Sequence, residues 1–521
     1  MNGLDLPQIA PNARSSFADA AACTAWLASL PSLHAATTHA ALATKLEELN
    51  GAHVAAPERL AMLEVLRGPI AAAQAEQAKK FAGKPLPHSQ QRREILASVT
   101  SLWDALGLGY QRALQALAAM GEDRASVALA CHRALDCTAR TMLAHAQAYV
   151  QPRPTDLARL HRLYALAEQR GFAVQPVPDS LSRTSRSCTA TRTYAQALLL
   201  DASSPRERKP EHVGLVDRWL GHWAPKIAVS PSPPRGASTT PLLVDLATES
   251  GAGRRERTGP TVRYLDVSEL ARSLAKRVHR IKQGKSPAEL GLEGNVDAQE
   301  VLALLVALYR HWCEDQPRRS HERRQVNAPA TVCAGIAATH LALGERAGAG
   351  AHARGSSLAD SQALGSETES LLAASSETWL LRDESIAGVG LVRRRDDTRA
   401  TRLGHGQLLM VRAEAGSAGM LVAVQWMQEA PNGDLHVGAR ILPGVPHPVT
   451  VCTPESAESE TQAIALSALA ALAAPPTLVL PRGWFRPGRA LKVSGRFAAD
   501  VRLTEVLEHG PDFERASFDP A

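Results

Sequence analysis

Residues 378–392 read TWLLRDESIAGVGLV, in which aromatic, aliphatic and β-branched residues flank the polar, glycine-containing segment DESIAG. Such residues favour strands, and the polar segment marks a strand boundary. Four more short segments of strand-like composition lie beyond Arg324, at residues 326–338, 407–412, 420–427 and 435–442. Asn432-Gly433 between the last two is a strong hairpin signal. Closely spaced antiparallel strands of this kind predict a small β-barrel.

The region that precedes this barrel has the pattern of successive helices. From about Phe17 to Trp223, Ala and Leu recur at three- and four-residue spacing, which is typical of helices that bury one face. Within 156–171, Gly171 supplies a helix stop, and one apolar stripe is formed by Leu157, Leu160, Leu163, Leu166 and Ala167. No fixed repeat period is evident, so a helical bundle or irregular stack is expected.

Changes in composition divide the chain into five segments of an α+β multidomain protein. We expect an Ala-rich, all-helical domain over 1–227, a flexible linker rich in Pro, Ser and Gly over 228–260, and a short strand with helices leading into the barrel over 261–317. The barrel occupies 318–452 and contains an insertion rich in Ala, Gly and Ser at 341–376. A helix near Ser459–Ala474 and a small β unit fill 453–521, with strands at 477–480, 490–493 and 501–503.

Composition restricts the class of protein. An apolar fraction of 45% and a charged fraction of 21% exclude wholesale disorder. The first residues lack the pattern of a secretory signal, and seven cysteines at irregular spacing fit a reducing compartment, so a cytoplasmic protein is expected. Residues 463–480 are apolar enough to suggest a membrane span, but Pro475 and Pro476 interrupt them, and no span is expected.

The basic segment RRSHERR, residues 318–324, stands directly before the first predicted barrel strand. Guanidinium groups stay charged and present a planar fork of donors, which suits phosphate. The same fork pairs with guanine O6 and N7, and its face can stack on a base. A ligand with both phosphates and guanines would engage all of the arginines, which are Arg318, Arg319, Arg323 and Arg324.

A second polar group lies in the segment DESIAG, residues 383–388. The Asp383 carboxylate can accept hydrogen bonds from the ring and exocyclic nitrogens of guanine, and Ser385 can donate to the backbone or to a ligand. Gly388 permits a close approach of the backbone or a turn with positive φ.

Together the two segments resemble the PilZ family, whose signature is R-x-x-x-R ahead of a barrel and [DN]-x-S-x-x-G on an early strand. Arg319 and Arg323 match the first motif, and the second is matched by Asp383, Ser385 and Gly388. Further along, 404–409 (GHGQLL), 424–426 (VQW) and 437–439 (VGA) resemble the later strands of the family. The resemblance covers about a quarter of the chain.

The resemblance implies a six-stranded antiparallel barrel that binds cyclic di-GMP, often as an intercalated dimer of the nucleotide. The arginines would hold phosphates and guanine edges, while Asp383 and Ser385 brace a guanine on the barrel surface. No metal or cofactor is implied. The expected function is that of a cytoplasmic second-messenger effector, which contacts a protein partner through its helical region; the family suggests motility or surface-attachment machinery.

Two alternatives stay open. The 341–376 insertion separates the two motifs, so the domain could be a degenerate PilZ barrel that acts only through protein contacts. The basic stretches around Arg254 and Arg394 could instead serve nucleic acid, although an aromatic content of 4% supplies few stacking platforms for single strands.

Enzymatic and metal-binding motifs are not found. Gly284-Lys285-Ser286 lacks the upstream glycine of a P-loop, where His279 stands instead. The spacing of Cys131, His132, Cys137 and His145 is not that of a zinc site. The sequence also lacks the G-x-S-x-G and H-E-x-x-H motifs and the GGDEF- and EAL-type motifs of cyclic di-GMP turnover, so we expect sensing without catalysis.

Overall fold

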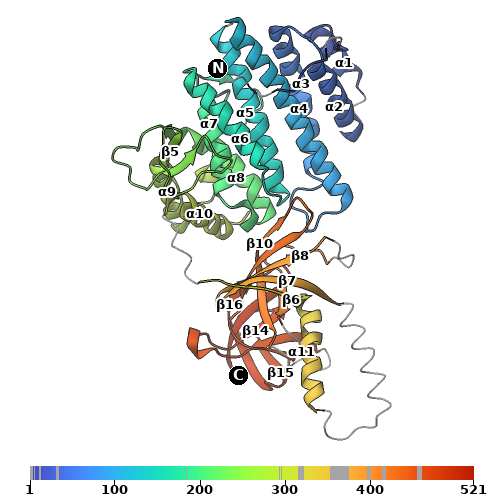
Figure 1. The fold of residues 1–521 in the computed structure, drawn as a ribbon. Helices are drawn as coiled ribbons and strands as arrows, with labels where there is room; N and C mark the ends of the chain where they lie inside the picture. The colour runs from blue at the N-terminus through green and yellow to red at the C-terminus, as the bar shows by residue number, and fades with distance from the viewer. Residues whose placement is uncertain are drawn as a thin grey trace. The chain divides into compact units, whose positions relative to one another are not determined.

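A computed structural model describes residues 4, 6–10, 13–30, 35–121, 123–182, 185–292, 294, 296–314, 322–351, 375–395, 401–413, 418–454 and 460–521. The chain forms two compact units (Figure 1). Unit 1 comprises Met1–Lys84 and His88–Arg318, and unit 2 comprises Pro85–Pro87 and Arg319–Ala521. The α+β multidomain class expected from the sequence is confirmed, with helices first and barrels after them.

Unit 1 consists mainly of helices packed around one hydrophobic core, which extends from Phe17 to Cys313. Sequence-encoded caps set several helix ends. The Ser89 side chain accepts a hydrogen bond from the backbone N–H of Arg92, and Gly121 ends the same helix with φ 72°. The helices are α1 (Ala20–Ser29), α2 (Ala35–Gly51), α3 (Ala56–Ala78), α4 (Gln90–Met120), α5 (Arg124–Gln147), α6 (Pro154–Gln169), α7 (Ala190–Ala202), α8 (Pro210–Trp223), α9 (Ser268–Lys282) and α10 (Ala298–Cys313).

Helix α6 confirms the apolar stripe predicted from the sequence. Leu157, Leu160, Leu163 and Ala167 are buried, and Leu166 packs against the same core. Gly171 follows with φ 73°, a left-handed conformation that a residue without a Cβ adopts at little cost. A short strand pair, β1 (Val177–Pro178) with β2 (Ser187–Cys188), connects α6 to α7.

The predicted flexible linker over 228–260 is wrong. Strands β3 (Ala228–Ser230) and β4 (Leu242–Asp245) pair on either side of β5 (Val262–Asp266) to form a three-stranded sheet. Leu242 and Val244 are buried in the core of unit 1, and burial of apolar side chains fixes the segment despite its Pro and Ser content. Helices α9 and α10 join the same core, so 261–317 belongs to the helical unit rather than forming a lead into the barrel.

The first half of unit 2 is a closed antiparallel barrel with strand order β10-β11-β8-β7-β6-β9. All five predicted strand segments contribute to it, and 378–392 supplies two strands joined by a turn. The predicted strand 326–338 is too long, because helix α11 (Gly335–Ala351) begins at Gly335, where φ is 80°. The insertion placed at 341–376 therefore starts within this helix, and 352–374 lies outside the described residues. The strands are β6 (Arg324–Ala334), β7 (Ser376–Ser385), β8 (Gly388–Arg393), β9 (Leu408–Arg412), β10 (Met420–Glu429) and β11 (Leu435–Ile441).

The second half of unit 2 is another closed barrel, with order β12-β13-β14-β17-β16-β15. The helix predicted near Ser459–Ala474 is wrong, because residues 461–466 form a strand and only 470–472 make a short 3-10 turn. The boundary at 452 is also wrong, since the new barrel begins at Pro446. Its strands are β12 (Pro446–Cys452), β13 (Thr461–Leu466), β14 (Thr477–Pro481), β15 (Ala490–Gly495), β16 (Ala499–His509) and β17 (Phe513–Pro520).

Strand β13 is buried on both faces. Ala463 and Ala465 pack inside the C-terminal barrel, whereas Ile464 and Leu466 join a second cluster with Met410 of the first barrel. A strand covered on both sides loses the apolar-polar alternation that identifies most strands. The two barrels and α11 thus share one hydrophobic core within unit 2.

Candidate functional site

One row of four residues crosses the outer face of the first barrel. Strand pairing places Asp383 opposite Gly390, Gly390 opposite Gly438, and Gly438 opposite Trp426. Directly paired residues point to the same side of a sheet. The neighbours of the two glycines along their strands, such as Val389 and Val437, are fully buried and face the barrel interior.

The two glycines allow the flanking side chains to lie flat on the sheet. A Cβ on Gly390 would stand 2.7 Å from the Asp383 Oδ1 atom, and one on Gly438 would stand 1.9 Å from the Trp426 Nε1 atom. The carboxylate and the indole ring therefore occupy the space that side chains at 390 and 438 would fill. The row thus sets a hydrogen-bond acceptor and an aromatic ring on the same face of the sheet, and such groups are used by proteins to hydrogen-bond and stack bases.

Asp383 is held by two arginines. Arg323, just ahead of β6, forms an ion pair with Asp383 Oδ1, and Arg382 Nε donates to Asp383 Oδ2 at 2.9 Å. Burial works to raise the pKa of Asp383, which is only 4% exposed, but hydrogen bonds from Arg382 and Arg323 outweigh it and lower the pKa below its usual value. The site thus contains an ionised Asp383 carboxylate that is paired with the guanidinium groups of Arg323 and Arg382.

Ser385 and Gly388 shape the turn between β7 and β8. The Gly388 N–H donates to the Ser385 hydroxyl at 3.2 Å, so the serine side chain closes the turn. A Cβ on Gly388 would lie 2.6 Å from the carbonyl oxygen of Ala439, which makes glycine necessary for the close approach of β8 and β11. In the structure Ser385 therefore contacts the backbone, one of the two roles that its hydroxyl allows.

The structure brings together part of the predicted site. Arg323 and Asp383 meet directly, although 60 residues separate them, and Arg324 pairs with Glu384, the next residue along β7. Arg318 and Arg319 lie outside the described residues. Sequence reasoning did not assign roles to Gly390, Arg382 or Gly438, because their significance comes from strand register and a bulge at Arg382. The local signals were the glycine at 390, two residues beyond the motif, and the segments 424–426 and 437–439, which resemble later strands of the PilZ family.

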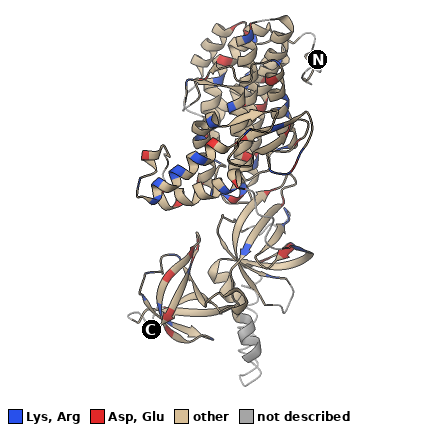
Figure 2. Cartoon of the chain, turned by 90° about the vertical axis from the view of Figure 1, so that its left-hand side faces the viewer, with Lys and Arg blue, Asp and Glu red and all other residues tan. Residues whose placement is uncertain are grey.

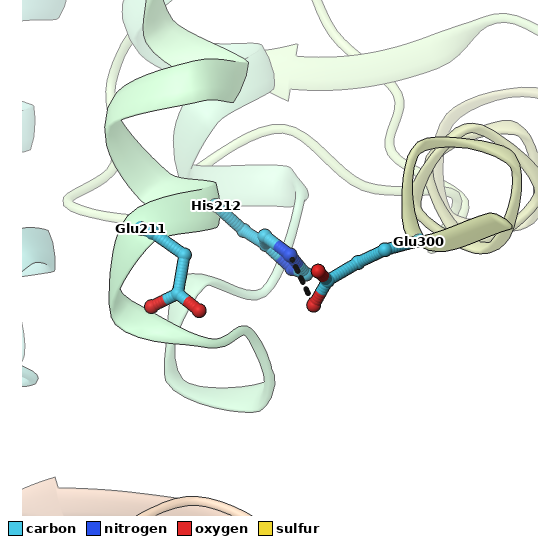
Figure 3. A group of neighbouring side chains, drawn as sticks. All are labelled: Glu211, His212 and Glu300. Carbon is cyan, nitrogen blue, oxygen red and sulfur yellow. Dashed lines mark hydrogen bonds and ion pairs between the residues drawn. The ribbon is translucent and has the colours of Figure 1, made fainter. Parts of the chain in front are cut away.

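A separate group in unit 1 brings metal-ligand atoms together. Oxygen and nitrogen atoms of Glu211, His212 and Glu300 lie within 4.8 Å of one another. Figure 3 shows the hydrogen bond between the His212 ring and the Glu300 carboxylate, whereas no such bond is drawn to Glu211. Lys209 also pairs with Glu300, and both carboxylates stand in the first turn of a helix, where the helix dipole favours negative charge. Structural roles account for this group without a metal.

Comparison with known proteins identifies the class of receptor that the chain resembles. Residues 21–234 match the family model described as "Cyclic-di-GMP receptor FimW, N-terminal domain", and residues 450–521 match "FimW C-terminal beta-barrel domain". The matched regions correspond to most of unit 1 and to the second barrel. The first barrel, 324–441, lies between the two matched regions, and neither family model covers it.

A particular relative carries the same name. The chain is 25% identical, over 329 residues, to the "Cyclic-di-GMP receptor FimW" of Pseudomonas aeruginosa. The alignment covers 62% of this chain and 53% of the relative, so the chain spans about half the length of that protein. Over the residues that the structure describes, no helix combines the length and apolar character needed to cross a membrane.

Proposed function

We propose that the chain is a cyclic di-GMP receptor and that the outer face of the first barrel binds the nucleotide as a PilZ-type domain. The observation that carries the proposal is the contact between Arg323 and Asp383 beside the row that ends at Trp426. In this arrangement the guanidinium groups bind phosphates and guanine edges, and Asp383 accepts hydrogen bonds from a guanine. Arg318, Arg319 and Arg324 complete the basic segment, and Ser385 and Gly388 hold the turn. The name of the Pseudomonas relative supports the choice of ligand.

The proposed role is that of a sensor that turns nucleotide binding into a protein contact. The chain would act in the cytoplasm, in keeping with seven cysteines that form no disulfide, and would not catalyse a reaction. A ligand shifts a conformational equilibrium only by its differential affinity for the two states. The basic segment at 318–324 joins the two units in the chain, so nucleotide bound there would favour one of their arrangements. Motility or surface-attachment machinery is the proposed output.

Helix α9 is the surface of unit 1 that we propose for the protein partner. Its exposed positions include Arg272, Lys276 and Arg280, which lie on one side of the helix. None of these three has an ion-pair partner among the residues that the structure describes. Elsewhere in unit 1 basic and acidic positions are mixed along the helices (Figure 2). An acidic protein surface would complement α9.

Calorimetric titration of the full chain with cyclic di-GMP tests the proposal. We expect saturable heat with cyclic di-GMP and none with GMP, which carries a single phosphate and cannot bridge the arginines and the guanine site. If a single-stranded oligonucleotide does not compete with cyclic di-GMP for the chain, the nucleotide site is distinct from a nucleic-acid-binding surface. A folded chain that produces no heat would leave the degenerate barrel as the correct description.

The glycine row gives a second prediction. Gly438→Ala places a methyl group where the Trp426 indole lies, so the ring must move off the sheet and its stacking contribution is lost. We expect about tenfold weaker binding of cyclic di-GMP, since base-aromatic stacking contributes about 1–3 kcal/mol per base. Gly404→Ala is the matched control, because no atom lies within 4 Å of a Cβ at 404. Equal binding by both variants would exclude Trp426 from the site.

A further inference from the structure

Arg440 lies on the same outer face as the proposed site. It is two residues beyond Gly438 on β11 and therefore points to the same side. Strand pairing sets Arg440 opposite Gly388, and Gly388 opposite Ser385. Two strand spacings separate Arg440 from Ser385, which is about 10 Å between backbones. An arginine side chain extending from this position reaches the edge of the proposed site.

Arg440 also faces the C-terminal barrel. Ala423, which is paired with Arg440 on the neighbouring strand β10, belongs to the core that the two barrels share. The Arg440 guanidinium is paired with the carboxylate of Glu508 on β16, which belongs to the second barrel. Among the described residues, the carboxylate that pairs with Arg440 is therefore one from the other domain.

A second arginine shares that carboxylate. Arg515 on β17 is paired in register with Glu508, and its Nε atom lies 3.7 Å from Glu508 Oε2. Both of those atoms are buried, and neither has a hydrogen-bond partner among the described residues. Two guanidinium groups with one carboxylate leave an excess of one positive charge, and burial of incompletely bonded charged groups is unfavourable. The group is therefore suited to receive an anion.

We propose that Arg440 forms a further anion subsite, which takes a phosphate of the bound nucleotide in exchange for Glu508. This inference rests on the proposed function of the first barrel. Charge favours the exchange because Glu508 keeps Arg515 as its counter-ion when Arg440 turns to the phosphate. Neither the carboxylate nor the phosphate is then left unpaired. The second barrel thereby restrains a binding residue of the first, and nucleotide binding releases one of the contacts between the two barrels.

Calorimetric titration of the full chain with cyclic di-GMP tests this exchange. Arg440→Ala removes the phosphate contact and is expected to weaken binding about tenfold. Glu508→Gln removes the competing charge and is expected to strengthen binding about threefold. In the double variant the Glu508→Gln substitution should have no effect, because the arginine that it frees is absent. Arg502→Ala, an exposed arginine on the same strand as Glu508, is the control and should bind as the unaltered chain does.

The outcomes separate this inference from the function on which it rests. If the unaltered chain does not bind the nucleotide, the proposed function fails. If the unaltered chain binds the nucleotide and Arg440→Ala binds it equally well, only the proposed subsite is overturned. If Glu508→Gln binds the nucleotide with unchanged or lower affinity, the exchange of Glu508 for a phosphate is overturned. Thermal melting checks that each variant folds. Should Arg440→Ala not fold, Arg440→Gln keeps the side-chain length without the charge, and the same loss of affinity is expected.

Discussion

Replacing Arg323 with alanine is expected to weaken cyclic di-GMP binding by about fiftyfold. Arg323 supplies a guanidinium at the carboxylate that is proposed to hold a guanine, and hydrogen bonds to charged groups contribute about 1.5–3 kcal/mol each. A loss of about 2.3 kcal/mol corresponds to a fiftyfold change in the dissociation constant. Calorimetry on the full-length variant measures it.

Two comparisons make this result specific. Arg323→Lys keeps the charge but not the planar fork, so binding intermediate between the alanine variant and the unaltered chain is expected. Arg502→Ala removes an equal charge from the surface of the second barrel and should leave affinity unchanged. The variant should still fold, because Arg382 continues to donate to Asp383 at 2.9 Å. Unaltered binding by a folded Arg323→Ala variant would show that the nucleotide is bound elsewhere.

Truncating Ile464 to alanine is expected to destabilise unit 2 by about 3 kcal/mol. Ile464 is fully buried in the core shared by both barrels, and large-to-small substitutions of this kind cost about 2–5 kcal/mol through lost contacts and the cavity left behind. Hydrogen exchange of peptides that cover β13 in the full chain measures the change. A loss of about 3 kcal/mol reduces protection by roughly a hundredfold where exchange requires opening of the unit.

Leu472→Ala provides the control for this experiment. Leu472 lies in the neighbouring 3-10 turn and is 47% exposed, so its truncation should change protection little. The sequence-based interpretation of the same region as a helix predicts a different outcome, in which Ile464 and Leu472 have similar effects. Equal losses in the two variants would therefore contradict the buried strand.

Some features of the fold and of the candidate site could be predicted from the sequence because a few neighbouring residues encode them. The helix stripe at 157–167 and the turn at Asn432-Gly433 follow from spacing of three to four residues or from a single dipeptide, and the structure has α6 and the β10–β11 hairpin in those places. The motif residues Arg323 and Asp383 were recognised because residue type and order carry the signal.

Other features could not be predicted because they depend on residues far apart in the chain. Three strand pairings assemble the row from Asp383 to Trp426, and no local pattern fixes their register. The contact of Arg440 with Glu508 joins two domains across 68 residues. The sheet at 228–266 forms despite a linker-like composition, because Leu242 and Val244 find a core elsewhere in unit 1.

The sequence by itself determined elements such as α6 and the strands of the first barrel, where the pattern of residues is local, and it determined the chemistry of the motif side chains. Tertiary structure alone decided the rest. Strand β13 is covered on both faces and shows no alternation of apolar and polar residues. The floor of the candidate site consists of glycines, and their role appears only when barrel closure sets a carboxylate and an indole ring above them. Short-range periodicity reports burial on one side, whereas closure of a barrel is a long-range event that no single segment specifies.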